Sequence, residues 1–387
     1  MPYKVKLLNN IAKAATDLLP KELYEVGEQV QSPDAIIVRS ADMHAYERNP
    51  ELVAIARAGA GVNNIPLEEC AKDGVVVFNT PGANANAVKE LVICALLLCG
   101  RDVLGGITWA RNLAGCCEDV EPTVEKGKKN FVGGEIAGKT LGVVGLGAIG
   151  VKVANAAVSL GMKVKGYDPM LSPAAKSTLC SEVTVVGSID ELWGCCDYIT
   201  LHLPLNDHTR HMVGEQQLSA MKPGTVLLNL ARGGLVDEAP LLAALDKGSL
   251  RGYVTDFPNE TVISHPKVLP IPHLGASTPE SEENCALMAA QQLRDYLEQG
   301  VIRNSVNYPA FDLPKTAPCR LCILHENDGA DLGGMVRVLL EDCGIVDTHR
   351  NERGGVAYTV VDLEHRPIDQ AIEGLHELQG VLRLRCL

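Results

Sequence analysis

Short apolar segments alternate with segments of helical periodicity along the first part of the chain. Compact apolar runs at residues 3–8, 35–39 and 75–78 predict strands, and helical patterns lie between them at residues 52–58 and 67–72. Short apolar strands separated by helices are typical of a parallel sheet that is covered by helices on both faces. The first part of the chain is therefore predicted to fold as an α/β domain.

A second α/β domain is predicted after a long apolar helix. The helix covers residues 88–103, and its apolar character on all sides predicts that it lies buried between two units. A charged segment at residues 118–129 follows and is predicted to be a loop. Ser188 and Glu191 form the capping-box pair that begins a helix. The other elements predicted here are strands at residues 141–144, 163–167, 197–202 and 225–229, and helices at residues 150–160, 239–245 and 278–297.

The end of the chain has the pattern of a small α+β domain. Pro309, Pro314 and Pro318 mark residues 307–318 as a linker. Beyond it the predicted order is strand, helix, strand, strand, helix, strand, which is the split βαβ arrangement. The strands are predicted at residues 320–324, 347–353, 356–362 and 381–384, and the helices at residues 331–343 and 368–378.

Length and composition restrict the class of protein. A chain of 387 residues with 46% hydrophobic residues is long enough for two or three domains with substantial cores. The net charge is −13, from 35 Lys and Arg against 48 Asp and Glu, and such an acidic chain is a poor ligand for nucleic acid. The longest apolar run, residues 91–99, is too short to cross a bilayer, and residues 1–4 carry no export signal. The protein is therefore predicted to be cytoplasmic.

The cysteines predict free thiols and no metal site. There are thirteen of them, an odd number in a long chain without an export signal, so a disulfide framework is not expected. Cys319 and Cys322 have the spacing of half a zinc site, but no second pair accompanies them.

The segment Gly145-Leu146-Gly147-Ala148-Ile149-Gly150 predicts a dinucleotide site. It follows a predicted strand and precedes a helix, where Gly145 permits a tight turn, Gly147 lets the backbone approach a pyrophosphate and Gly150 allows close packing. Asp168 ends the next strand, and a carboxylate there binds ribose hydroxyls and repels a 2′-phosphate, so NAD is favoured over NADP. The alternative is a tight turn and an unrelated Asp-Pro turn.

Three side chains have the chemistry that hydride transfer to or from a 2-hydroxy acid requires. His273, in a loop after a short apolar run, has a pKa suited to carrying the hydroxyl proton. Arg232, after the predicted strand at residues 225–229, suits the carboxylate because its planar group binds two oxygens at once. Glu260 is a candidate partner that keeps an imidazole protonated. The alternatives are a structural histidine, a surface arginine and a solvated acid.

These blocks together resemble the D-isomer-specific 2-hydroxyacid dehydrogenases. The resemblance covers essentially the whole chain, and the combination of blocks is more specific than any single one. It rests on GLGAIG with Asp168, NLARGGLVDE (229–238), DFPNE (256–260), PHLGAST (272–278), VRS (38–40), RAGAGVNN (57–64) and NTPGAN (79–84).

The resemblance implies a role for each candidate residue. Arg232 binds the substrate carboxylate, His273 is the acid/base, Glu260 is its paired acid, and Asp256 meets the nicotinamide carboxamide. Only twelve residues separate Glu260 from His273, so this loop is trimmed relative to many members. The implied cofactor-binding residues are Gly145, Gly147, Ala148, Ile149, Gly150, Asp168, His202, Leu203, Pro204, Leu230, Ala231, Asp256, Gly275 and Ala276, and the implied substrate-binding residues are Arg39, Asn79, Thr80, Pro81 and Gly82.

Within the family, the blocks are most similar to those of members that act on 3-phosphoglycerate. The resemblance therefore implies NAD-dependent oxidation of D-3-phosphoglycerate to 3-phosphohydroxypyruvate, the first step of serine biosynthesis, with Arg39 as a candidate phosphate partner. Lys89 has two alternative roles: it adds positive charge that binds the substrate, or it is a solvated residue at the start of a helix. Two alternatives stay open: reduction of glyoxylate or hydroxypyruvate, and a non-catalytic regulator that senses NAD.

The resemblance also implies a domain organisation. The C-terminal segment resembles an ACT domain, in which His325, Glu326 and Asn327 match the region where some relatives bind serine, although no Asn stands at residues 344–346. A domain retained for packing or assembly is the alternative, and a homodimer or homotetramer is expected. The predicted domains are a substrate-binding domain (1–92 and 276–306), an NAD-binding Rossmann domain (93–275), a linker (307–318) and an ACT-like domain (319–387).

Overall fold

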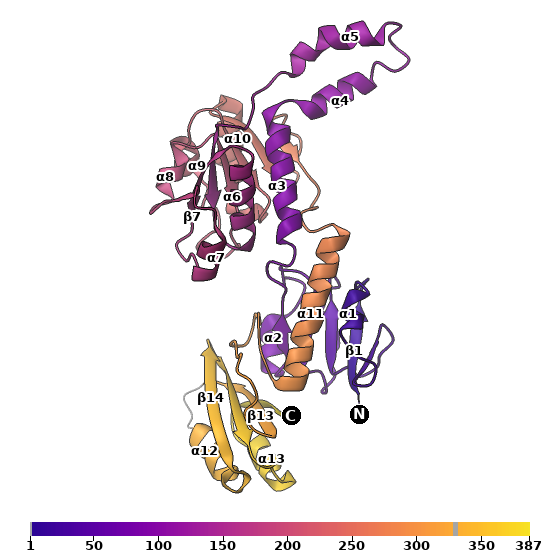
Figure 1. The fold of residues 1–387 in the computed structure, drawn as a ribbon, viewed down its shortest axis with the longest axis vertical. Coiled ribbons are helices and arrows are strands. Elements are labelled where there is room, and N and C mark those ends of the chain that lie inside the picture. The colour runs from indigo at the N-terminus through magenta and orange to yellow at the C-terminus, as the bar shows by residue number, and fades with distance from the viewer. Residues whose placement is uncertain (1, 328–331) are drawn as a thin grey trace. The chain divides into compact units, whose positions relative to one another are not determined.

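The short apolar runs of the sequence form three β-sheets, and the first two are parallel throughout. The computed structural model describes residues 2–327 and 332–387. The chain divides into two units (Figure 1): the first comprises Met1–Asn84 and Pro279–Leu387, and the second comprises Ala85–Thr278. The predicted fold class, two parallel α/β sheets and a small C-terminal α+β sheet, is confirmed.

The parallel sheet of the first unit has five strands in the order β2-β1-β3-β4-β5 and is covered on both faces. Its elements are β1 (Tyr3–Leu8), α1 (Ala14–Asp17), β2 (Tyr24–Gly27), β3 (Ala35–Val38), β4 (Ala54–Arg57), α2 (Leu67–Lys72), β5 (Val76–Phe78) and α11 (Pro279–Gln299). The long helix α11 packs on one face, and α2 contributes to a second apolar cluster. Burial on two faces explains why these strands are continuous apolar runs.

Residues 52–58 contain a strand where the sequence pattern predicts a helix. β4 pairs in parallel with β3 and with β5, and Ala54, Ile55 and Ala56 are fully buried. A short apolar run that is buried on both faces has no periodicity that separates strand from helix. The helix prediction is therefore wrong, and pairing with neighbouring strands decides the conformation.

The second unit is built on a seven-stranded parallel sheet of order β12-β11-β10-β9-β6-β7-β8. Apolar side chains of α3 and α6 share one cluster with the sheet, and α8, α9 and α10 contribute to another. The strands predicted from residue 140 onward are confirmed, and β8, β11 and β12 are additional strands. The elements are α3 (Ala85–Gly100), α4 (Val103–Arg111), α5 (Val120–Gly127), η1 (Lys128–Phe131), β6 (Thr140–Val144), α6 (Ala148–Ser159), β7 (Lys163–Tyr167), α7 (Pro173–Thr178), β8 (Thr184–Val185), α8 (Asp190–Trp193), β9 (Tyr198–Leu201), α9 (Glu215–Ala220), β10 (Thr225–Asn229), η2 (Gly233–Leu235), α10 (Glu238–Lys247), β11 (Leu250–Thr255) and β12 (Val268–Pro270).

A helical hairpin replaces the loop predicted at residues 118–129. The predicted long helix ends at Gly100, and α4 begins anew where the Asp102 side chain accepts a hydrogen bond from Gly105 N at 2.9 Å. The charged segment forms α5 and η1, so the loop prediction is wrong. α5 buries no residue, and an ion pair between Glu125 and Lys128, three residues apart, supports it. Figure 1 shows α4 and α5 as the two arms of this hairpin. The rings of Trp109 in α4 and Phe131 in η1, with centroids 5.4 Å apart, join the arms.

Within the described residues no single helix is long and apolar enough to cross a membrane. Helices α3 and α4 together reach that length and composition, and they are bent by 72° at their break.

The C-terminal sheet is antiparallel, with strand order β14-β15-β13-β16. The βαββαβ order is as predicted, and the first residue of the helix predicted at 331–343 lies outside the described residues. Tyr308 and Phe311, within the predicted linker, are buried in the core of the first unit. The domain boundaries stay a prediction. The elements are β13 (Cys319–Glu326), α12 (Leu332–Leu339), η3 (Glu341–Cys343), β14 (Ile345–Arg353), β15 (Val356–Leu363), α13 (Asp369–His376) and β16 (Val381–Cys386).

Candidate active site

The carboxyl ends of the strands in the second unit place the candidate residues along one edge of its sheet. Because every pair of neighbouring strands is parallel, all the strands end at the same edge, where ligands bind in folds of this class. The residues found there are Asp168 after β7, Gly145 after β6, His202 after β9, Arg232 after β10, Asp256 after β11 and His273 after β12.

The glycine turn between β6 and α6 needs glycine at two positions. Gly145 has φ +93°, and a Cβ there would lie 2.5 Å from the carbonyl oxygen of His202. A Cβ on Gly150 would lie 1.9 Å from the Gly145 carbonyl oxygen. Gly147 faces open space, and α6 begins directly after it with free N–H groups. The turn can therefore hold an anionic group such as a diphosphate.

Asp168 lies against this glycine turn. Its Oδ2 accepts a hydrogen bond from Leu146 N at 2.9 Å, and its Oδ1 accepts one from Met170 N at 2.8 Å. The half-buried carboxylate keeps further acceptor capacity, because each oxygen has a second lone pair. The structure thus brings together the turn and the acid that the sequence predicts for one dinucleotide site.

His202 lies beside the same turn and is kept neutral. Burial lowers the pKa of its imidazole to about 4. The ring Nε2 lies 3.1 Å from Thr200 Oγ1, and the buried Nδ1 has no hydrogen-bond partner among the described residues. At neutral pH this ring is an uncharged hydrogen-bonding group next to the glycine turn.

The turn that carries Arg232 is shaped by Asn229, which is fully buried. Asn229 Nδ2 donates to the Arg232 carbonyl oxygen at 2.8 Å, and its Oδ1 accepts from Ala231 N at 3.3 Å and from Arg232 N at 3.4 Å. A buried amide with these bonds holds one turn conformation. Asn229 has no role in the prediction from sequence, although a polar residue that ends an apolar strand is a signal for one.

Phe257 joins the Arg232 turn to His273. The rings of Phe257 and His273 are 4.6 Å apart, and a Cβ on Gly233 would lie 3.4 Å from Phe257 Cβ. Aromatic packing at this distance limits the orientations of the imidazole, which is otherwise exposed. This positioning role of Phe257 is absent from the prediction from sequence, because it depends on contact between separate turns.

Glu260 lies on an exposed turn after β11. The preceding Asn259 anchors this turn, because its Nδ2 donates to Glu238 Oε1 at 2.6 Å and its Oδ1 accepts from Thr261 N at 3.1 Å. The pairing of Glu260 with His273 stays a prediction.

Asp256 is a buried acid with an unused acceptor. It is 2% exposed, and its Oδ1 is buried without a hydrogen-bond partner among the described residues. Its Oδ2 lies 3.4 Å from the position that a Cβ on Gly275 would occupy, so glycine there gives access to the acid. Burial raises the pKa of this carboxyl to about 6, and the Arg232 charge works in the opposite direction. An unsatisfied buried acceptor is suited to an N–H group of a ligand.

The raised pKa of the Asp256 carboxyl predicts that the stability of the protein depends on pH. Its pKa is raised above the usual value of 3.8, so between about pH 4 and 6 the native state keeps a proton that the unfolded chain has lost. Stability contributed by the protonated form is therefore lost as the pH rises through this range, by up to about 3 kcal/mol. Urea unfolding from pH 4 to 7 should show the free energy of unfolding of Asp256→Asn rising relative to wild type. A difference between the two proteins that does not change with pH would contradict this assignment.

In the first unit, Arg39 and the segment Asn79–Gly82 lie around a second arginine. Arg39 follows β3 and forms an ion pair with Glu282 of α11 at 2.6 Å. Arg57 Nε, at the end of the neighbouring β4, donates to the Arg39 carbonyl oxygen at 3.1 Å. The Arg57 side chain also packs against Gly59, whose carbonyl oxygen accepts from Thr80 N at 3.1 Å. Arg57 has no role in the prediction from sequence, although an arginine at a strand end is a signal for an anion site.

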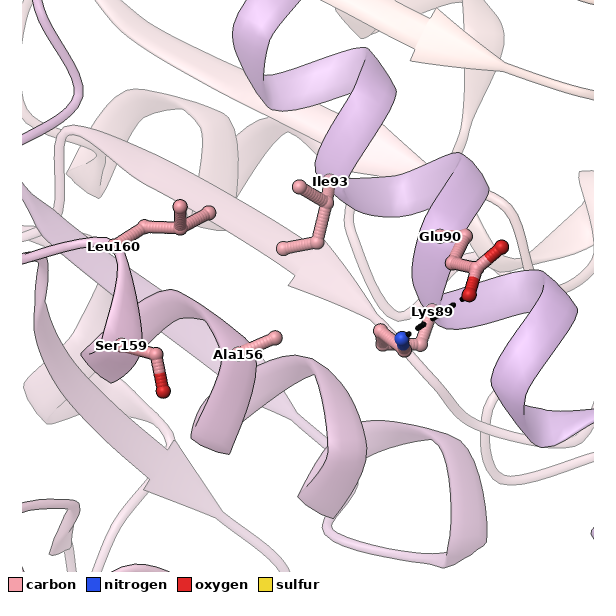
Figure 2. Close-up of a pocket in the computed structure, with 6 residues that line it drawn as sticks. All are labelled: Lys89, Glu90, Ile93, Ala156, Ser159 and Leu160. Atoms are coloured by element: carbon pink, nitrogen blue, oxygen red, sulfur yellow. Dashed lines mark hydrogen bonds and ion pairs between the residues drawn. The ribbon is translucent and has the colours of Figure 1, made fainter.

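Lys89 lies in the first turns of α3, in the second unit. It pairs with Glu90 at 3.4 Å and lines a groove of about 420 Å³ with Ile93 (Figure 2). The opposite wall is formed by Ala156, Ser159 and Leu160, at the C-terminal end of α6 and its flank. The glycine turn is at the other end of α6, so this placement favours a solvated helix start for Lys89.

Comparison with known proteins finds relatives with both the sequence blocks and the fold. The family model described as "D-isomer specific 2-hydroxyacid dehydrogenase, NAD binding domain" matches residues 107–275. The chain is 34% identical over 319 residues to the D-3-phosphoglycerate dehydrogenase of Methanocaldococcus jannaschii, covering 79% of this chain and 57% of that protein. It is 32% identical over 354 residues to the D-3-phosphoglycerate dehydrogenase of Escherichia coli, covering 87% of this chain and 82% of that protein.

The fold is similar to that of a solved structure. The cofactor (NAD+)-bound 3-phosphoglycerate dehydrogenase of Entamoeba histolytica has a TM-score of 0.62 and 28% identity, covering 79% of this chain and 99% of that chain. The chain spans only 53–57% of the length of the first curated relatives that it matches.

Proposed function

This chain belongs to the D-isomer specific 2-hydroxyacid dehydrogenases, and on that premise we propose that it oxidises D-3-phosphoglycerate to 3-phosphohydroxypyruvate with NAD. The observation that carries the proposal is the similarity to the Escherichia coli D-3-phosphoglycerate dehydrogenase over 87% of this chain and 82% of that protein. The glycine turn with Asp168, and the Arg232 turn with Phe257 and His273, are consistent with the cofactor and substrate chemistry of such an enzyme.

Different residues of the second unit are proposed to bind the substrate, transfer the proton and hold the cofactor. Arg232 binds the substrate carboxylate through its planar guanidinium group and so fixes the position of the neighbouring carbon. His273 accepts the hydroxyl proton as the alcohol becomes a ketone, and Glu260 is its proposed partner that stabilises the imidazolium. NAD, when bound, would supply the hydride acceptor. Asp256 would hold its carboxamide through Oδ1, which has no hydrogen-bond partner among the described residues.

Specificity for a phosphorylated substrate is proposed to come from the first unit. Arg57, at the carboxyl end of β4, packs against Gly59, whose carbonyl oxygen binds Thr80 N. Arg39, at the carboxyl end of the adjacent β3, is paired with Glu282 and would exchange this partner for the phosphate. In a chain with a net charge of −13, an anionic substrate needs such local positive charge.

A comparison of substrates tests the proposed function. NADH formation is followed in a spectrophotometer with D-3-phosphoglycerate and with D-glycerate, and NADH consumption with 3-phosphohydroxypyruvate, hydroxypyruvate and glyoxylate. We expect kcat/KM to be about tenfold to hundredfold higher for the phosphorylated member of each pair, the value of one or two charge-assisted hydrogen bonds. A preference for glyoxylate or hydroxypyruvate would show that the substrate is one of these compounds and not 3-phosphoglycerate. No turnover of any compound would favour a non-catalytic NAD sensor.

Removal of the Asp168 charge should weaken the preference for NAD. We expect Asp168→Asn, which keeps an acceptor for Leu146 N, to lower the ratio of kcat/KM for NAD over NADP by about tenfold or more, because the repulsion of a 2′-phosphate is lost. Asp190→Ala, which removes an exposed carboxylate in the same unit, is the matched control. An unchanged ratio in Asp168→Asn would exclude the ribose contact.

The C-terminal segment is proposed to be an ACT-type regulatory domain with serine as its candidate ligand. His325 is 2% exposed and its Nε2 lies 2.9 Å from Thr359 Oγ1, while Asn327 Oδ1 accepts from Arg350 at 2.7 Å. These polar groups gather where β13 ends. The NADH assay repeated with serine distinguishes a sensor, whose rate falls, from a domain kept for packing or for assembly of a homo-oligomer.

A further inference from the structure

Two thiols that are far apart in the sequence meet at one end of the C-terminal sheet. Cys319 begins β13 and Cys386 ends β16, and their Sγ atoms are 3.2 Å apart. The strands are held in register by two backbone hydrogen bonds next to the thiols, from Arg320 N to Leu387 O at 2.9 Å and from Leu387 N to Arg320 O at 2.8 Å. Both side chains belong to the apolar cluster under the helices of this sheet. The contact is therefore part of the sheet geometry.

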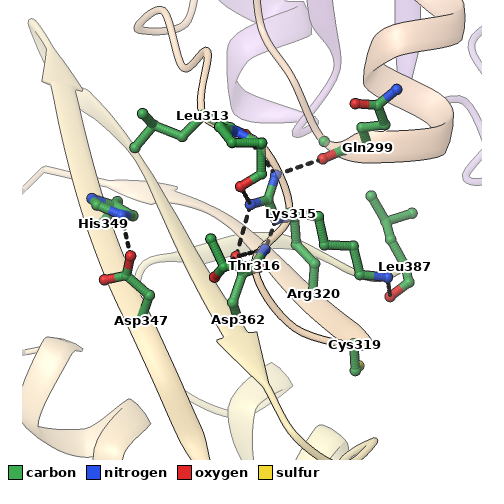
Figure 3. Close-up of polar contacts among 12 residues, drawn as sticks. Gln299, Leu313, Lys315, Thr316, Cys319, Arg320, Asp347, His349, Asp362 and Leu387 are labelled. Atoms are coloured by element: carbon green, nitrogen blue, oxygen red, sulfur yellow. Dashed lines mark hydrogen bonds and ion pairs between the residues drawn. The ribbon is translucent and has the colours of Figure 1, made fainter.

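We propose that Cys319 and Cys386 form a reversible dithiol–disulfide site that fastens the C-terminal strand to β13. A disulfide requires its sulfurs to be about 2.05 Å apart, so the two Sγ atoms have to approach by only about 1.2 Å. Figure 3 shows Cys319 next to Arg320, whose buried side chain fixes this part of β13, and shows Lys315 bound to the terminal Leu387 at 3.1 Å. Both strands are thus held by contacts on either side of the thiols.

The accessibility of the two sulfurs sets the order of the reaction. Cys386 is partly exposed, whereas Cys319 is 6% exposed. Burial, together with the neighbouring Cys386, raises the pKa of the Cys319 thiol above its ordinary value, so the less exposed Cys319 reacts second.

The oxidant is a low-molecular-weight disulfide such as glutathione disulfide. The Cys386 thiolate attacks one of its sulfurs and expels one thiolate, which leaves a mixed disulfide. Cys319 then loses its proton, attacks the Cys386 sulfur and expels the second thiolate. In total the two protein thiols lose two electrons and two protons, and the small disulfide is reduced to two thiols.

A third thiol and a metal are the competing explanations for this cluster. Cys343 is 7% exposed in the same apolar cluster and provides a matched control. In the part of the chain that the structure describes, no group of three Cys, His, Asp or Glu residues is arranged to hold a metal ion. The paired thiols are therefore assigned to redox chemistry.

The strand that the disulfide would fasten carries two arginines that bind the rest of the first unit. Arg385 donates to the carbonyl oxygens of Tyr296 at 3.0 Å and Leu297 at 2.8 Å, at the end of α11. Arg383 donates to the carbonyl oxygens of Pro50 and Asp73, both at 2.9 Å. Closing the disulfide at the end of β16 limits fraying of this strand and so stabilises both sets of contacts.

The test uses the full chain, native and folded, with glutathione disulfide as the oxidant. We expect peptide mapping by mass spectrometry to find Cys319 joined to Cys386, alkylation of these two thiols to be lost, and the apparent Tm to rise by several degrees. A reducing agent should reverse all three changes. Cys343→Ala should behave like wild type, while Cys319→Ala and Cys386→Ala should each lose the cross-link and the Tm rise. Failure to form this cross-link in the native protein, or a cross-link of either thiol mainly to Cys343, would overturn the proposal.

Discussion

Replacing His273 by alanine is expected to lower kcat for NADH formation by about 10²–10⁴-fold, the usual contribution of a general acid or base. The imidazole lies at the carboxyl edge of the sheet and packs against Phe257 at 4.6 Å, so it is positioned without contributing to the buried core. The loss should therefore appear in turnover, with the Kd for NAD within about twofold of wild type. Steady-state kinetics with 3-phosphoglycerate, together with NAD titration by calorimetry, measures the two quantities separately.

The control for this prediction is His376→Ala, which removes an exposed histidine from the end of α13 and should leave kcat unchanged. A His273→Ala protein that keeps more than about a tenth of the wild-type turnover would remove the proton-transfer role. A protein that loses NAD affinity in proportion to turnover would instead point to a disturbed cofactor site.

Replacing Asp362 by alanine is expected to destabilise the protein by about 3–5 kcal/mol, because it leaves a buried guanidinium without its partner. Arg320 and Asp362 are 1% and 3% exposed, and two hydrogen bonds join them, from Nε to Oδ1 at 2.7 Å and from Nη2 to Oδ2 at 2.9 Å (Figure 3). Burial disfavours the carboxylate, but the Arg320 hydrogen bond and two bonds from Thr316 outweigh it and lower the pKa of Asp362. The free energy of unfolding in urea measures the loss.

The double variant Arg320→Met with Asp362→Leu separates the ion pair from the packing around it. Replacing both charges by apolar side chains of similar volume removes the uncompensated charge, so the double variant should be more stable than Asp362→Ala alone. Arg320 also donates to the carbonyl oxygens of Gln299, Leu313 and Pro314, and these lose a donor in the double variant. A loss below about 1 kcal/mol in Asp362→Ala would show that the pair is solvated and contradict the buried network.

The two wrong predictions of secondary structure have the same physical origin. At residues 52–58 the strand β4 is decided by pairing with β3 and β5, and at residues 118–129 the helix α5 is formed in a segment whose polar composition resembles a loop. Neither segment has a local pattern strong enough to decide its conformation. Where the local signal is strong, as in the glycine turn before α6, prediction and structure agree. At the predicted capping pair, Glu191 Oε1 accepts a hydrogen bond from Ser188 N, but α8 begins at Asp190 with Ile189 as its N-cap.

Sequence alone determined the features of this protein that depend on short stretches of the chain. The strand and helix alternation, the glycine turn and the blocks containing Arg232, Glu260 and His273 depend on residue type and short spacing, because backbone conformation and side-chain chemistry are set over a few residues. Tertiary structure alone decided which distant residues touch. The stacking of Phe257 on His273, the two arginines at the ends of β3 and β4, and the thiols of Cys319 and Cys386 all depend on the packing of whole strands. No short-range pattern carries that information, since contacts between residues far apart in the chain are fixed by burial and sheet register.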